Sequence, residues 1–191
     1  PASPPPASLP QQARPWPGAE GRATLPGVMR ATITHIALHV ADAEACIAFY
    51  QEVCGLRIVH ERQASGGAGG GAGGSEGRVV WMAAEGQERV FVIVLLPGGP
   101  GATRAPGDVS HIGLAVDRPA AVDEMAEVGR SRGCLMMEPV DEGYPVGRFV
   151  CLSDPDGNVV EVSYGQPLGP GAPSRDEDGD DDRWYGHRAY A

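Results

Sequence analysis

Hydrophobic and polar positions between residues 33 and 164 follow the same order twice. Each half opens with an alternating apolar run, at 33–40 and at 110–116, and continues with a segment whose apolar residues recur at helical spacing. Three further apolar runs complete each half. Alternation with period two predicts strands, and the helical spacing predicts amphipathic helices. The pattern therefore predicts an α+β fold made of two βαβββ units.

Capping and breaking residues predict where these elements begin and end. Asp42 suits the N-cap of a helix over 43–53, and Pro119 and Gly133 suit the start and the end of a helix over 119–131. The expected strands are 33–40, 56–62, 78–83, 89–96, 110–116, 135–138, 147–153 and 159–164. Neither unit could bury its sheet face alone, so we expect the two to join or to pair with another chain.

Composition separates the predicted folded part from its flanks. Residues 1–28 are rich in Pro, Ala and Gly, residues 65–77 are nearly all Gly, Ala and Ser, and 176–182 is an acidic run. Such segments lack the apolar residues that form a core. We therefore expect a disordered leader over 1–28, a flexible insertion over 65–77 and a disordered tail over 167–191. The expected folded bounds are 29–166 for the domain, 31–96 for module one and 109–166 for module two.

Charge and cysteine content narrow the class of protein. The net charge of −10 argues against a nucleic-acid binder, which needs Lys and Arg to neutralise phosphates. The four cysteines show no CxxC spacing and lie in apolar surroundings, as reduced core residues do. No apolar run approaches the roughly 20 residues of a transmembrane helix. We expect a cytoplasmic protein without membrane or nucleic-acid partners. If the leader is the remnant of a transit peptide, the location is instead an organelle matrix.

Two histidines and one glutamate occupy corresponding places in the two units. His35 and His111 each open an alternating run, and Glu161 alternates with Val160 and Val162 in the last run. A glutamate between valines is costly to bury unless it is paired or binds a metal. Two histidines and a carboxylate form a known ligand set for a divalent ion with open positions. The alternative is that all three are ordinary hydrogen-bonded or solvent-facing residues.

Three further residues are candidates for binding a substrate. His39 shares a strand face with His35 but lies about 13 Å along the strand, too far to share its metal. Tyr144 and Arg148 lie on the loop and strand that lead to Glu161, and Arg148 could anchor an anionic group. For Arg148, a surface salt bridge is the alternative.

The sequence resembles the vicinal oxygen chelate superfamily over about residues 31–165. That superfamily includes glyoxalase I, extradiol dioxygenases, fosfomycin-inactivating transferases and bleomycin-resistance proteins. The matching features are the duplicated units and these motifs: His-x-x-Leu-x-Val at 35–40 and 111–116, Ala48-Phe49-Tyr50 with Gly55-Leu56, and Asp154-Pro155-Asp156-Gly157-Asn158 before Glu161. The resemblance implies paired modules that form a curved mixed sheet around a cavity. It also implies one divalent ion (Fe, Mn, Ni, Zn or Co) bound by His35, His111 and Glu161.

For function, the resemblance implies an enzyme, often a homodimer, that acts on a small molecule with vicinal oxygens. The expected chemistry is glyoxalase-like lyase or isomerase chemistry, in which the metal chelates two substrate oxygens and stabilises an enediolate-type intermediate. Glu161 would then move the proton. In some relatives the two halves of a site come from two subunits, so His35 would meet the other two ligands across a dimer.

This chain departs from the well-known subgroups at two positions. Val94 stands where glyoxalase I has a carboxylate ligand, and Cys151 stands where extradiol and fosfomycin enzymes have a tyrosine. Two alternatives therefore stay open. One is an extradiol-type Fe(II) ring-cleaving dioxygenase, and the other is a metal-free binding protein of the bleomycin-resistance type.

Overall fold

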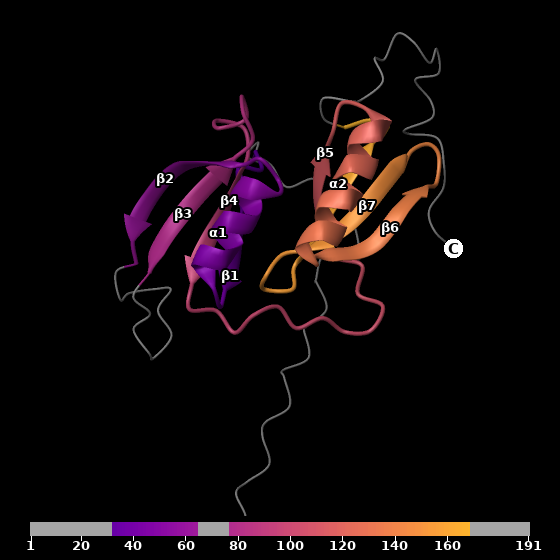
Figure 1. Cartoon of the computed structure of the whole chain (residues 1–191). Coiled ribbons are helices and arrows are strands. Elements are labelled where there is room, and N and C mark those ends of the chain that lie inside the picture. Colours follow the sequence, from indigo (N-terminus) through magenta and orange to yellow (C-terminus); the bar gives the residue numbers. More distant parts are fainter. Residues whose placement is uncertain (1–31, 65–76, 169–191) are drawn as a thin grey trace, which may run out of the picture. The chain divides into compact units, whose positions relative to one another are not determined.

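The computed structural model describes residues 32–64 and 77–168, which contain two modules with the same order of elements (Figure 1). Module one consists of β1 (His35–Val40), α1 (Ala43–Glu52), β2 (Arg57–Gln63), β3 (Arg78–Ala83) and β4 (Val92–Pro97). Module two consists of β5 (Ile112–Ala115), α2 (Pro119–Arg132), β6 (Leu135–Asp141), β7 (Arg148–Ser153) and β8 (Val159–Tyr164). The chain divides after Thr32, and every one of these elements belongs to the part that begins at Ile33.

Each module forms a four-stranded mixed sheet. The strand orders are β1-β4-β3-β2 and β5-β8-β7-β6. The opening strand of each module pairs in parallel with the last strand, and the remaining pairs are antiparallel. The two opening strands, β1 and β5, therefore lie at sheet edges. The predicted α+β fold of paired βαβββ modules is confirmed, and its strands form two sheets of the same topology.

Helix boundaries agree with the predicted caps. The Asp42 carboxylate accepts a hydrogen bond from the backbone N–H of Ala45 at 3.0 Å, which satisfies one free donor at the start of α1. Gly133 ends α2 in the left-handed conformation, with φ of 68°, which glycine adopts without a steric penalty. The strand predicted over 89–96 is wrong at its start. Hydrogen-bonded turns continue to Phe91, so the ladder begins at Val92.

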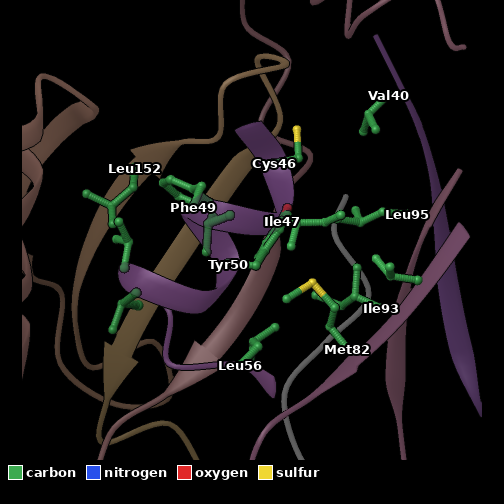
Figure 2. Close-up of a cluster of buried hydrophobic side chains, with 14 of the residues drawn as sticks. Val40, Cys46, Ile47, Phe49, Tyr50, Leu56, Met82, Ile93, Leu95 and Leu152 are labelled. Atoms are coloured by element: carbon green, nitrogen blue, oxygen red, sulfur yellow. The ribbon is translucent and has the colours of Figure 1, made fainter. Parts of the chain in front are cut away.

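A single cluster of buried apolar side chains connects α1 with both sheets (Figure 2). Ile47 and Tyr50 of α1 belong to it, together with Leu95 of the first sheet and Leu152 and Val160 of the second. Removing such side chains from water is the main driving force for folding. Because the cluster includes strands from both sheets, the two modules share one core.

The turn between β7 and β8 makes polar contacts with module one. The Oδ1 atom of Asp154 accepts hydrogen bonds from the backbone N–H groups of Asp156 at 3.0 Å and Asn158 at 2.7 Å. The Tyr50 hydroxyl donates to Oδ2 of Asp154 at 3.2 Å, and the Asp156 carboxylate accepts from the N–H of Ala41 at 2.8 Å. The segment Asp154-Pro155-Asp156-Gly157-Asn158 thus forms the turn of the β7–β8 hairpin.

Several predictions fall on other parts of the chain. The predicted leader lies outside the described residues. Residues 65–76 of the Gly-rich insertion and the tail from residue 169 onward also lie outside them. Within 32–64 and 77–168, no helix is both long enough and apolar enough to cross a membrane. All four cysteines are free thiols, as predicted.

Candidate metal centre

Two of the three predicted ligands face each other in module two. Glu161 lies in the middle of β8, where it pairs with Gly113 of β5, and His111 directly precedes β5. The parallel pairing of β5 with β8 therefore carries both side chains to one place. The His111 Nε2 atom lies 3.4 Å from Oε2 of Glu161, and the carboxylate is buried, with 6% of the residue exposed.

Hydrogen bonds to the far atoms of both groups fix their orientation. The Nδ1 atom of His111 lies 2.8 Å from the carbonyl oxygen of Val109. Since a carbonyl can only accept, Nδ1 donates the proton of this hydrogen bond, and in the neutral form of the ring the lone pair is on Nε2. The Gln166 side-chain amide donates to Oε1 of Glu161 at 2.8 Å, so Oε2 is the oxygen turned toward His111.

This arrangement fits a divalent metal ion. Two donor atoms that are each about 2.1 Å from one ion lie about 3.0–3.4 Å apart at octahedral or tetrahedral angles. The 3.4 Å between His111 Nε2 and Glu161 Oε2 matches that spacing. Metal-binding histidines commonly donate their other N–H to a carbonyl, and metal-binding carboxylates are commonly hydrogen-bonded on the far oxygen. Val109 and Gln166 supply those two outer contacts here.

The third predicted ligand, His35, lies elsewhere in the chain. It opens β1 with an exposed side chain, and its Nδ1 atom lies 3.0 Å from the Thr34 hydroxyl. Among the residues that the structure describes, no group of three or more His, Cys, Asp or Glu side chains is close enough to hold a metal. A single chain therefore brings together His111 and Glu161 and leaves His35 apart from them.

Comparison with known proteins identifies the family. The family model of the glyoxalase/bleomycin resistance protein/dioxygenase superfamily matches residues 32–162, which is more than half of the chain. The chain belongs to this superfamily. It is also 49% identical over 144 residues to the uncharacterized protein PA2024 of Pseudomonas aeruginosa, a match that covers 75% of this chain and 96% of that protein.

Solved structures of other superfamily proteins share the fold. The fosfomycin resistance protein FosX from Listeria monocytogenes, in its monoclinic form at pH 6.5, aligns with a TM-score of 0.55 at 21% identity, covering 72% of this chain and 96% of FosX. A FosX variant in complex with Mn(II) and 1S,2S-dihydroxypropylphosphonic acid aligns with a TM-score of 0.52 at 22% identity, covering 72% and 95%. A glyoxalase I mutant from Zea mays aligns with a TM-score of 0.51 at 19% identity, covering 69% of this chain and 43% of the maize protein.

The three predicted substrate residues of this superfamily member lie in different surroundings. His39 is exposed on β1, and Tyr144 is exposed in the turn before β7. Arg148 forms an ion pair with Asp123 of α2, which corresponds to the alternative of a salt bridge. Arg148 and Cys151 are three residues apart on β7, so their side chains point to opposite faces of the sheet. Cys151 pairs with Glu161, which places Arg148 on the helix side, away from that carboxylate.

Sequence reasoning missed two residues near the predicted ligands, Gln166 and His60. The contact of Gln166 with Glu161 depends on the turn after β8, where Gly165 has a φ of 87°, and the sequence does not specify which side chain that turn directs at the carboxylate. His60 and Trp81 pair across β2 and β3, with ring centroids 4.9 Å apart. A register shift between Ile58 and His60 moves His60 to the other face of the sheet, so counting by alternation assigns it wrongly.

The positions that depart from the subgroup patterns lie beside these residues. Val94 is buried on β4, where it pairs with Ala37 of β1 and Trp81 of β3. An apolar side chain therefore occupies the position at which glyoxalase I has a carboxylate. Cys151 lies directly across from Glu161. Burial raises the pKa of the Cys151 thiol, and the charge of Glu161 raises it further. Cys151 is therefore a neutral thiol next to the carboxylate.

Proposed function

We propose that this protein is a metal-dependent enzyme of the superfamily, glyoxalase-like in reaction type, that acts on a small substrate with two neighbouring oxygens. The observation that carries the proposal is the oriented pair of His111 Nε2 and Glu161 Oε2, 3.4 Å apart. Both groups have their other polar atom occupied by a protein partner. In the FosX complex with the same fold, the bound ion is Mn(II).

The third ligand in this proposal is His35 from a second copy of the chain. His35 lies on β1, whereas His111 and Glu161 lie beside β5. Both β1 and β5 are edge strands of their sheets. Of the residues in β1, only Val40 is buried, and Ile36 is exposed although it is large and apolar. Such an edge is available for contact with another chain. A homodimer with two shared sites follows from twofold symmetry.

The protein residues would divide the work as follows. A divalent ion held by His35, His111 and Glu161 would supply positive charge that stabilises negative charge developing on two substrate oxygens. Glu161 is the candidate proton carrier because its carboxylate is buried in the site. Gln166 holds Oε1, so Oε2 is the atom that can exchange a proton or bind the ion.

Metal content of the purified protein and of single variants tests this proposal. The wild-type chain should bind about one divalent ion per chain, and His111→Ala should lose it because one ligand atom disappears. His35→Ala should lose it as well. His39→Ala is the matched control on the same face of β1, and its metal content should equal that of the wild type. Absence of metal from the wild type after reconstitution would refute the enzyme function.

A mixture of two variants tests whether the site is shared. A dimer of one His35→Ala chain and one His111→Ala chain contains one site with both histidines and one site with neither. If chains mix at random, half of the dimers are mixed, so metal binding should recover to about one quarter of the wild-type level. A site formed within one chain would give no recovery. The identity of the bound metal then directs the activity assay.

A further inference from the structure

A cavity of about 490 Å³ lies beside His35 in module one. Its lining comes from β1 to β4 and the turn before β4, and includes Val59, His60, Trp81 and Arg89. Cavities of this size accommodate small organic molecules. Because His35 lines one side, a molecule in the cavity can present oxygens to the site proposed for the metal. The other lining residues then determine which chemical groups the rest of that molecule can carry.

Two aromatic rings, those of His60 and Trp81, line the cavity side by side. Trp81 pairs with Val94 on one side and with His60 on the other, and the His60 ring is tilted by 59° to the indole. The register shift in β2 aims His60 at this face. Bulges of this kind often serve to direct a side chain near a functional site. A half-exposed indole bordered by an imidazole favours a planar ring that stacks on it.

Among the described residues, Arg89 at the cavity has no carboxylate partner. Glu88 also lines the cavity, but its carboxylate accepts a hydrogen bond from Arg57 and from the backbone N–H of Gly86. In the described part of the chain, no ion pair or side-chain hydrogen bond involves Arg89. The guanidinium is thus available for an anion, and its planar geometry suits a carboxylate.

We propose that this cavity binds the distal end of the substrate, and that this end is an aromatic acid whose ring stacks on Trp81 and whose carboxylate pairs with Arg89. The inference rests on the proposed function for the role of His35, and it goes further by naming the substrate class. Trp81 and Arg89 then determine specificity, since they contact the part of the molecule that lies away from the reacting oxygens.

Calorimetric titration of the full chain in the presence of a chelator tests the cavity without the metal. The three probes are phenylpropionate, cyclohexylpropionate, which keeps the charge and loses the flat ring, and phenylpropionamide, which keeps the ring and loses the charge. The wild type should bind phenylpropionate about fivefold more tightly than the cyclohexyl acid. It should bind phenylpropionate about tenfold more tightly than the amide.

Each variant should remove one preference and retain the other. Trp81→Leu should abolish the preference for the phenyl ring, and Arg89→Gln should abolish the preference for the acid. Arg62→Gln is the matched control, because Arg62 is an exposed arginine of β2 outside the cavity lining, and it should keep both preferences. Circular dichroism verifies that each variant is folded. Arg89 lies in a turn, so its substitution tests the proposal even if the Trp81 variant unfolds.

Three results would overturn the inference. The first is equal binding of the acid and the amide by the wild type. The second is a preference for the acid that persists in Arg89→Gln. The third is loss of all binding in the presence of the chelator, which would place the ligand on the metal. The result of the metal-content experiment does not depend on these binding results. A chain that binds no metal but shows both preferences would refute the proposed enzyme function and leave the cavity assignment intact.

Discussion

Replacing Tyr50 by phenylalanine removes one hydroxyl from the core and leaves its packing unchanged. Tyr50 is fully buried at 0% exposure, and its hydroxyl donates to Oδ2 of Asp154, which is 3% exposed. Hydrogen bonds to charged groups contribute about 1.5–3 kcal/mol. The 3.2 Å length is long for an O–H donor, and Asn158 Nδ2 still donates to the same oxygen at 2.9 Å. We therefore expect a loss of about 1.5 kcal/mol in the free energy of unfolding.

Urea unfolding followed by circular dichroism measures this loss. The midpoint should fall at an unchanged slope, because the surface exposed on unfolding is nearly the same. The melting temperature should fall by about 3–6 °C. Tyr164→Phe is the control, since within the described residues the Tyr164 hydroxyl makes no hydrogen bond, and its change should be small. A loss below about 0.5 kcal/mol for Tyr50→Phe would refute the view that this bond links the modules.

The pH dependence of the same pair of proteins gives a second test. Burial raises the pKa of Tyr50 far above its ordinary value of 10.0, and the charge of Asp154 adds to the effect. The folded state therefore keeps the phenol neutral, while the unfolded state ionises it above about pH 10. Stability from Tyr50 is fully present below that pH and is lost as pH rises. The stability advantage of the wild type over Tyr50→Phe should fall by about 1.4 kcal/mol per pH unit above pH 10, so that it vanishes near pH 11 (about one unit higher) and then changes sign.

Three further outcomes follow from particular contacts. Gly147→Ala should lower the free energy of unfolding in urea by more than about 2 kcal/mol, because the new Cβ would collide with the backbone of β8. Gly133→Ala is the control: its Cβ would meet open space, so it should cost about 1 kcal/mol. Gln166→Leu should weaken metal binding about 10- to 100-fold in chelator competition, and unchanged affinity would contradict its orienting role. Burial raises the pKa values of Cys46 and Cys54 to about 12, so mass spectrometry should detect alkylation of both at pH 8 only after unfolding.

The element order was predictable because it depends on local periodicity. The spacing of apolar residues predicted both βαβββ modules, and Asp42, Pro119 and Gly133 marked helix ends that the structure confirms. The start of β4 was predicted wrongly, since the backbone groups near Gln87 bond to one another in turns before the ladder begins. Such local competition between turn and ladder leaves little trace in the hydrophobic pattern.

The amino-acid sequence alone was enough to indicate the superfamily and to single out His35, His111 and Glu161 as candidate ligands, because the two histidines open corresponding runs of a duplicated unit and the glutamate lies between valines in the last run. It was not enough to pair them. The parallel register of β5 with β8 joins His111 to Glu161, and the separate sheet that carries β1 leaves His35 apart. The contacts of Gln166, and the register shift that turns His60 toward Trp81, also depend on residues distant in sequence or on a break in alternation. Strand pairing is a long-range interaction, so only the folded chain specifies which of these side chains meet.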